Sequence, residues 1–208
     1  SEDAVPALIK ALKDGQWNVR ESAAWALGQL GSVDAIPALI QTLKDQDFDV
    51  RRETVGALGK IGSVDAAPAL IKLLQDGDVS VRLTTILALK CIGTPETLKA
   101  IKEHQQPLIQ AALKGSNQYA SASAVEELAH IGTPEAIEAI KDIVPTLIQA
   151  LQGQDFSVHG VVVEALKAIG KEAVPALILT LQDQNQDVNV RLNMILALTG
   201  IGTPEALN

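Results

Sequence analysis

The 208-residue chain has few of the residues that support disulfide, metal or cofactor chemistry. It contains a single cysteine, Cys91, which excludes an internal disulfide and a zinc-ribbon site. It has three histidines, and aromatic residues make up 2% of the chain. No apolar run is long enough to span a membrane, and no signal peptide is visible. The sequence therefore predicts a soluble, cytoplasmic protein that needs no cofactor and binds no membrane.

Positive charge is also scarce, because 17 Lys and Arg residues are set against 25 Asp and Glu residues, for a net charge of −8. Nucleic-acid binders normally carry a basic patch, so this balance argues against a nucleic-acid partner. No phosphate-cradling glycine loop is present, and Ser121 and Ser123 lack a convincing His or Asp partner for nucleophilic catalysis. We therefore expect no catalytic residues and no enzyme activity.

What the chain has in abundance is repetition. Residues 35–62 read AIPALIQTLKDQDFDVRRETVGALGKIG, and closely similar segments lie 31 residues before and 31 residues after them. A proline opens each unit, and a glycine follows it 25 to 27 residues later. The prolines are Pro6, Pro37, Pro68, Pro107, Pro145 and Pro175, and the glycines are Gly31, Gly62, Gly93, Gly132, Gly170 and Gly202. Self-similarity at a fixed period predicts an array of stacked units.

Each unit is predicted to form two helices. In residues 35–62, Leu39, Ile40 and Leu43 are spaced as one apolar helix face, with Asp34 as a candidate N-cap. Asp49 is a candidate N-cap for the second helix, and the closing glycine is a typical helix end. The apolar face of that second helix consists of Val50, Val55, Leu58 and Ile61. Two helices of this length cannot bury these faces alone, so neighbouring units must stack.

The predicted fold is therefore all-α, a right-handed α-α superhelix (solenoid) of six helical-hairpin repeats in one domain, residues 1–208. The predicted units are residues 1–31, 32–62, 63–93, 94–132, 133–170 and 171–202, with the start of a seventh at 203–208. Because the chain does not begin with methionine and ends on the opening of a unit, we expect it to be a piece of a longer solenoid or a processed form.

The motifs A-x-P-x-L-I, D…V-R and A-L-G-x-I-G recur in this order in the regular units. They resemble the short HEAT-like repeat of phycobilin lyase subunits, and similar repeats occur in bacterial scaffold proteins and in deoxyhypusine hydroxylase. The resemblance covers essentially the whole chain. It implies a scaffold that binds a protein partner on its concave face. It also implies an alternative, a phycobilin (chromophore) lyase subunit or a phycobilisome-associated chaperone, which would bind a bilin.

The iron-binding His-Glu pairs of the hydroxylase are missing from this chain. His104 is followed by Gln, His130 by Ile and His159 by Gly. That activity is therefore disfavoured.

Units four and five depart from the regular pattern. Thr94-Pro95-Glu96 and Thr133-Pro134-Glu135 read as strong helix starts, and each adds about two helical turns before the marker proline. Pro107 and Pro145 then fall inside a helix, where we expect a kink or a break. Glu127 stands where the other units have alanine, and a run of small residues precedes it at 120–124. We expect the loosest stacking around these two units.

Arginine recurs at one position of the second helix, preceded by aspartate. The arginines are Arg20, Arg51, Arg82 and Arg191, and the aspartates are Asp14, Asp45, Asp76 and Asp183. One interpretation is a basic stripe that binds a ligand. The strict period favours the other interpretation, a ladder in which each arginine bonds carboxylates and helix ends of its own or the next unit.

A second set of positions varies widely between units and remains once the core positions are removed. Trp25 belongs to it, and its equivalents are Gly56, Leu87, Glu126, Glu164 and Leu196. In repeats of this type such a stripe faces the concave surface, so Trp25, Leu83 and Leu87 around Gly56 would form an apolar notch for a partner. Incidental exposure is the other interpretation. The predicted protein-binding residues are Trp17, Trp25, Arg52, Gly56, Leu83, Leu87, Cys91, Glu126 and His130.

Three further features have residues that could form a site. Trp17 shares its position with Phe48 and Phe156, which suggests a structural role over the turn between helices. Glu126 and His130, with Glu164 of the next unit, have the chemistry of a divalent-metal site, but an ordinary solvated Glu–His pair is the favoured interpretation, and no metal is predicted. Cys91 is the one thiol able to carry a bilin, although a small buried cysteine is the commoner outcome.

Overall fold

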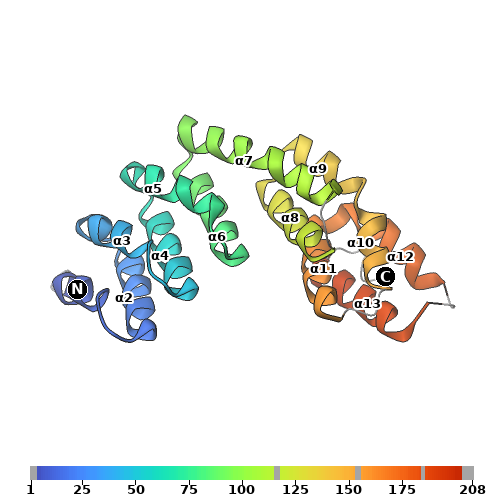
Figure 1. Cartoon of the computed structure of the whole chain (residues 1–208), viewed down its shortest axis with the longest axis horizontal. Helices are drawn as coiled ribbons and strands as arrows, with labels where there is room; N and C mark the ends of the chain where they lie inside the picture. Colours follow the sequence, from blue (N-terminus) through green and yellow to red (C-terminus); the bar gives the residue numbers. More distant parts are fainter. Residues whose placement is uncertain (1–3, 115–117, 153–155, 184–185, 203–208) are drawn as a thin grey trace. The chain divides into compact units, whose positions relative to one another are not determined.

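The computed structural model describes residues 4–114, 118–152, 156–183 and 186–202, which form helices and short connections with no strand among them (Figure 1). The helices are α1 (Val5–Ala11), α2 (Trp17–Leu30), α3 (Ile36–Thr42), α4 (Phe48–Ile61), α5 (Ala67–Lys72), α6 (Val79–Ile92), α7 (Pro95–Lys114), α8 (Gln118–Ile131), α9 (Pro134–Lys141), α10 (Val144–Ala150), α11 (Phe156–Ile169), α12 (Val174–Gln182) and α13 (Val188–Ile201). Short 3-10 turns lie at η2 (Val33–Ala35), η3 (Val64–Ala66), η4 (Leu73–Gln75) and η5 (Gly170–Glu172). The predicted all-α solenoid of helical hairpins is confirmed.

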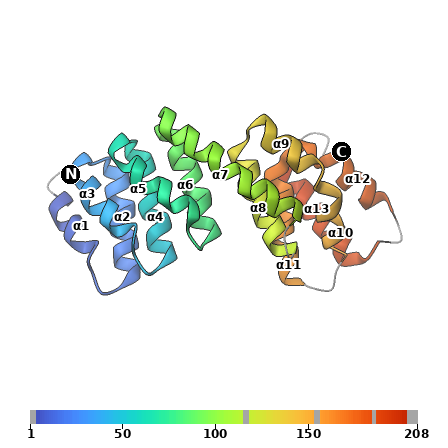
Figure 2. The same cartoon turned by 45° about the horizontal axis from the view of Figure 1, so that its top comes forward.

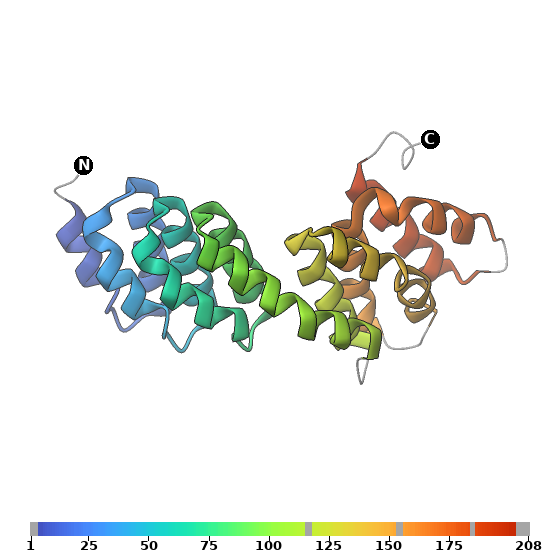
Figure 3. The same ribbon diagram turned by 90° about the horizontal axis from the view of Figure 1, so that it is seen from above.

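The chain divides into two compact units, residues 1–104 and 105–208, and α7 runs across the division. In the first unit the longer second helices α2, α4 and α6 pack side by side (Figures 1 and 2). Its helices follow one another in sequence order, from blue to green in Figure 3. In the second unit α8 packs against α11, and α11 packs against α13. A single superhelix over all 208 residues, and its right hand, stay predictions.

The core of the repeats lies where the apolar periodicity predicts it. Leu39, Val55 and Leu58 are completely buried, whereas Ile40 and Ile61 are half-buried and edge the core. The apolar face is therefore real but narrower than the sequence suggests.

Neighbouring second helices touch closely at a glycine. A β-carbon added to Gly28 of α2 would lie 2.7 Å from the Cα of Ala57 on α4, and one added to Gly59 would lie 2.8 Å from the Cβ of Ala88 on α6. These contacts explain why alanine recurs at the Ala57 position.

The closing glycines end their helices as predicted. All six adopt a left-handed backbone, with φ between 64° and 70°. The N-cap predictions at Asp34 and Asp49 are wrong. Asp47 caps α4, because the helix begins at Phe48 and the Asp47 carboxylate accepts from the N–H groups of Asp49 (2.9 Å) and Val50 (3.2 Å). Asp34 lies within η2, and α3 begins two residues later, after Ala35.

The added turns in repeats four and five are present, and the two marker prolines in them behave differently. The Thr133 hydroxyl caps α9 by accepting from the N–H of Ala136 (3.2 Å), and α10 begins with Pro145 in its first turn. The predicted break is therefore confirmed at Pro145. At Pro107 the break is absent, because α7 continues through that residue, and the kink there stays a prediction. Proline has no N–H to donate to the carbonyl of Glu103, four residues earlier. Because Glu103 and Pro107 are both exposed, water can reach that carbonyl.

The small residues of α8 do not leave a loose core. Ala122, Ser123 and Ala124 are buried, and Glu127 is buried beside them. These positions are therefore filled, and the looser stacking expected around repeats four and five stays a prediction. The division between the compact units lies in α7, inside repeat four, which is one of the two repeats where the loosest stacking is expected.

Candidate functional site

Two of the recurring arginines form an inter-repeat ladder, and a third bonds to its own inter-helix link. Arg20 forks onto Asp45 of the next repeat, with Nε–Oδ2 at 2.6 Å and Nη2–Oδ1 at 2.8 Å. Arg51 binds Asp76 in the same way, at 2.8 and 2.9 Å. The remaining guanidinium nitrogen of each reaches a carbonyl of its own inter-helix link, and Arg82 does the same at the carbonyl of Asp76 (2.7 Å). The structural interpretation is confirmed for these three arginines, and for Arg191 it stays a prediction.

This pairing shifts the titration of the two carboxyl groups. The Arg20 hydrogen bond lowers the pKa of Asp45 against the opposing effect of burial. Burial acts to raise the pKa of Asp76, but the hydrogen bonds from Arg51 and from the Asp78 N–H outweigh it, and the pKa lies below its ordinary value. Both carboxylates are therefore held ionised at the repeat interfaces.

The variable stripe of the first unit contains exposed and half-buried residues on three neighbouring helices, and we call it the Trp25 face. It consists of Glu21, Trp25 and Gln29 of α2, Arg52, Gly56 and Lys60 of α4, and Leu83, Leu87 and Cys91 of α6. Trp25 is 53% exposed and Leu87 47% exposed, and Cys91 is also exposed. A β-carbon added to Gly56 would meet a single atom within 4 Å, Thr84 Cγ2 at 4.0 Å. The space between the tryptophan and the leucine is therefore open.

Polar contacts fix the side chains around this space. Arg52 pairs with Asp49 (2.8 Å) on its own helix and lies 3.7 Å from Glu21 on α2. The Gln29 amide oxygen accepts from Lys60 Nζ (2.7 Å) and from the indole Nε1 of Trp25 (3.1 Å). These contacts hold the indole in one orientation and occupy the charged groups beside it. The face therefore combines the exposed apolar side chains of Trp25 and Leu87 with polar groups that are already paired.

Trp17, also predicted to bind, lies at the start of α2 and is half-exposed, as is Phe48 at the equivalent position of α4. The indole of Trp17 therefore covers its turn only in part. Its contribution to binding stays a prediction.

The remaining predicted site residues, Glu126 and His130, lie on α8 in the second unit. His130 Nδ1 hydrogen-bonds to the backbone carbonyl of Glu126 (2.8 Å), and Glu164 of α11 pairs with Lys167 (2.8 Å). Burial raises the pKa of Glu126; the His130 ring opposes this rise, and the charges of Glu164 and Glu127 add to it. Across the described ranges, no three His, Cys, Asp or Glu side chains are grouped closely enough to hold a metal.

Two buried histidines were not anticipated by the sequence interpretation. His104 of α7 lies 3.3 Å from the Gln75 amide, and His159 of α11 lies 3.3 Å from the Asn193 amide. His159 occupies the position of the ladder arginines, and this equivalence could have indicated from the sequence that its side chain lies between repeats.

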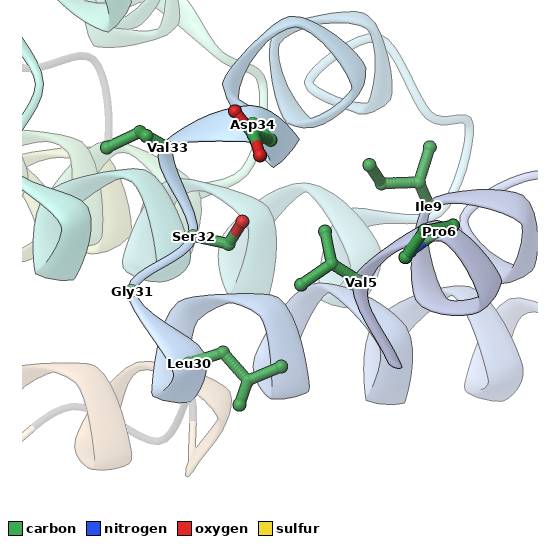
Figure 4. Close-up of a pocket in the computed structure, with 8 residues that line it drawn as sticks. All are labelled: Val5, Pro6, Ile9, Leu30, Gly31, Ser32, Val33 and Asp34. Atoms are coloured by element: carbon green, nitrogen blue, oxygen red, sulfur yellow. The ribbon is translucent and has the colours of Figure 1, made fainter. Parts of the chain in front are cut away.

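A hollow of about 590 Å³ lies beside the first hairpin, between α1, the end of α2 and η2 (Figure 4). It is lined by Val5, Pro6, Ile9, Leu30, Gly31, Ser32, Val33 and Asp34. Asp34 is the one ionisable side chain among these eight residues, so they supply no acid–base pair. Within the part of the chain that the structure describes, no helix is both long enough and apolar enough to cross a bilayer.

Stacked hairpins joined by a polar ladder define the molecule as an α-helical repeat protein. Within this class the chain belongs to the HEAT-repeat family, because the family model of HEAT repeats matches residues 1–45, 36–107, 105–177 and 144–208. No curated protein sequence matches it. The finer assignment to the short phycobilin-lyase type of repeat stays a prediction.

Several solved structures are similar. The complex of CpcE and CpcF of phycocyanin lyase from Nostoc sp. PCC7120 is 29% identical, with a TM-score of 0.50 over 100% of this chain and 80% of that one. An engineered protein is 28% identical, with a TM-score of 0.44 over 95% and 96% of the two chains. Human deoxyhypusine hydroxylase in complex with glycerol is 24% identical, with a TM-score of 0.41 over 98% and 75%.

Proposed function

We propose that the chain is a non-enzymatic scaffold that binds a protein partner on the Trp25 face. The observation that carries this proposal is the half-exposed indole of Trp25, at a position where other repeats have glycine, leucine or glutamate. Since the fold does not require a large apolar side chain there, its exposure suits recognition. Membership of the HEAT-repeat family supports the same class of function.

The surroundings of Trp25 suit an interface hot spot. Tryptophan is enriched among residues that dominate binding energy, and such residues lie in patches from which water is excluded on binding. The hydrogen bond that the Trp25 indole donates to Gln29 fixes the ring before a partner arrives, which reduces the ordering cost of association. The open space at Gly56 would accept an apolar side chain of the partner between Trp25 and Leu87.

The test compares Trp25→Ala with Phe48→Ala, a matched truncation of another half-exposed aromatic residue in the same unit. A partner is first recovered with the wild-type chain, and its affinity for each variant is then measured by calorimetry. We expect Trp25→Ala to weaken binding more than roughly tenfold and to leave Tm nearly unchanged. Phe48→Ala should bind as the wild type does. A sharp loss of stability with unchanged binding would show that Trp25 is a structural residue and would end this proposal.

A second candidate is a subunit of a phycobilin lyase or a phycobilisome-associated chaperone. It is favoured by the similarity to the CpcE–CpcF complex along the whole chain and by the exposed thiol of Cys91 on the Trp25 face. Mixing the chain with a phycobilin should then change the visible absorbance of the pigment, and Cys91→Ser should reduce that change if the thiol contacts it. An unchanged spectrum would leave the scaffold as the function.

A further inference from the structure

The second compact unit contains a small pocket of about 150 Å³ between α8, α9, α11 and η5. Its apolar lining consists of Ala129, Ile137, Ile140, Ala168 and Ile169. Ile140 is buried and Ile137 is exposed, so the pocket reaches from the core of the repeat to its surface. An apolar cavity of about this volume can hold one small hydrocarbon such as benzene. The space therefore suits a single branched aliphatic group.

The pocket is open because two of its side chains are short. Ala129 and Ala168 stand at the positions that Lys167 and Gly200 occupy one repeat later. There the chain of Lys167 fills the space, since a β-carbon added to Gly200 would lie 2.6 Å from the Lys167 Cε. In repeat five the added helix α9 contributes two isoleucines to the wall of the pocket. The pocket is therefore a local feature of this repeat and not a general property of the array.

The mouth of the pocket carries one positive and one negative side chain. Lys171 and Glu172 of η5 line it, and both are exposed. Among the residues that the structure describes, neither of them forms an ion pair. The link that carries them runs from closing glycine to marker proline over residues 170–175, one residue shorter than the links 31–37 and 62–68 of regular repeats. Two opposite charges therefore stand beside one apolar space.

We propose that this pocket binds a free α-amino acid with a branched aliphatic side chain, such as leucine. The side chain enters the apolar space, the carboxylate accepts hydrogen bonds from the Lys171 ammonium, and the ammonium of the ligand donates to Glu172. A ligand with a single charge would leave one group at the mouth unmatched and would face a like charge there. A zwitterion matches both groups.

This site is separate from the Trp25 face. The pocket is built entirely from residues of the second compact unit, whereas the Trp25 face belongs to the first. Failure of amino-acid binding therefore leaves the proposed protein-binding function intact, and the reverse also holds.

An NMR titration of the full chain tests the ligand class. With L-leucine added up to about 50 mM, the amide signals of Ile137, Lys171 and Glu172 should shift with a Kd of about 1–10 mM. Glycine keeps both charges but has no side chain, and it should bind roughly tenfold more weakly or worse. The same loss is expected for 4-methylpentanoate, which lacks the ammonium, and for 3-methylbutylamine, which lacks the carboxylate. N-acetyl-leucine amide has the side chain without either charge and should also bind weakly.

Filling the pocket provides the first variant. Ala168→Leu should abolish leucine binding because the new side chain occupies the space of the ligand. Gln29 and Lys60 stand at the equivalent position of the first two repeats, so a longer side chain is compatible with the fold, and circular dichroism checks it. Ala7→Leu, at an exposed site on α1, is the matched control and should bind leucine as the wild type does.

Neutralising each charge at the mouth provides an independent readout. Glu172→Gln should weaken leucine binding and strengthen the binding of 4-methylpentanoate, because the like charge is gone. Lys171→Gln should have the corresponding effect on 3-methylbutylamine. A change that lowers the affinity for every ligand alike would contradict the assigned contacts.

Three results overturn the proposal: leucine shifts no signal of the pocket, Ala168→Leu binds leucine unchanged, or glycine binds as tightly as leucine. Equal binding of N-acetyl-leucine amide and leucine would also overturn it, since the pocket would then take a leucine side chain of a polypeptide.

Discussion

Arg51 and Arg52 are neighbours on α4, yet their guanidinium groups lie in different surroundings. Arg51 bridges to Asp76 of the next repeat, whereas Arg52 contacts Asp49 and Glu21 on the Trp25 face. Successive residues of a helix are separated by about 100° around its axis, so one step in sequence moves a side chain from the repeat interface to an open surface. The helix phase therefore decides whether an arginine is structural or available to a ligand.

The ladder makes stability depend on pH. Because the pKa of Asp45 is lower in the folded chain than its ordinary value of 3.8, the folded state is favoured while this group is ionised. That contribution is complete above the ordinary value and is lost as pH falls through the folded one. We expect Asp45→Asn to lower the free energy of unfolding by about 1–3 kcal/mol at pH 7. The difference from the wild type should shrink below pH about 4.

Urea titrations at neutral and acid pH measure this difference, with Asp65→Asn as the control because its side chain is exposed. The control should stay within roughly 0.5 kcal/mol of the wild type. A deficit for Asp45→Asn that is the same at both pH values would mean that packing, not the ionised pair, carries the effect.

The ladder was predictable from the sequence because an aspartate and an arginine recur together at equivalent positions of successive repeats. Such a regular recurrence does not arise by chance. The sequence did not allow the cap of α4 to be placed. Asp47 and Asp49 both precede apolar helical residues, and the choice between them depends on whether Phe48 belongs to the helix. The exposure of Trp25 was predictable from the variety of its equivalents, but its hydrogen bond to Gln29 depends on side-chain orientation.

At the scale of helices, repeats four and five show how one sequence device gives two structures. Both open with Thr-Pro-Glu and both gain the predicted turns, but α7 is continuous and the second segment is divided into α9 and α10. Around Pro107, His104 and Gln105 are buried and hydrogen-bonded to Gln75 and Thr133 respectively. These contacts hold the turn of α7 that leads into Pro107. Tertiary packing of this kind cannot be read from a proline and its spacing.

Pro107 should therefore be a strained element of an otherwise regular helix. Pro107→Ala restores the missing backbone donor at an exposed site, and we expect it to stabilise the chain by about 1–3 kcal/mol after allowance for the freer unfolded state. Pro37→Ala is the matched control: Pro37 lies in the first turn of α3, where no donor is lost, so this change should be neutral or slightly destabilising. Equal effects at the two sites, measured by chemical denaturation, would contradict the assignment.

At the scale of the whole molecule, the repeats were predictable because each carries its own proline, apolar faces and closing glycine. The division into two compact units lies inside repeat four, one of the two repeats where the sequence favours the loosest stacking, but its position between residues 104 and 105 was not predictable. It depends on how many contacts each repeat shares with its neighbours, and no single motif records that quantity. In a linear array a poor junction separates blocks that open independently.

The distribution of tryptophan allows this independence to be measured. Trp17 and Trp25 both lie in the first compact unit, so indole fluorescence reports that unit alone, whereas far-ultraviolet circular dichroism reports helices of both. We expect the two urea transitions not to coincide. Leu58→Ala, at a completely buried site of the first unit, should shift the fluorescence transition by the equivalent of about 2–5 kcal/mol. Leu166→Ala, equally buried in the second unit, should shift the dichroism curve and leave the fluorescence midpoint in place. If both substitutions move both signals together, the chain unfolds as one cooperative array and the division in α7 has no energetic meaning.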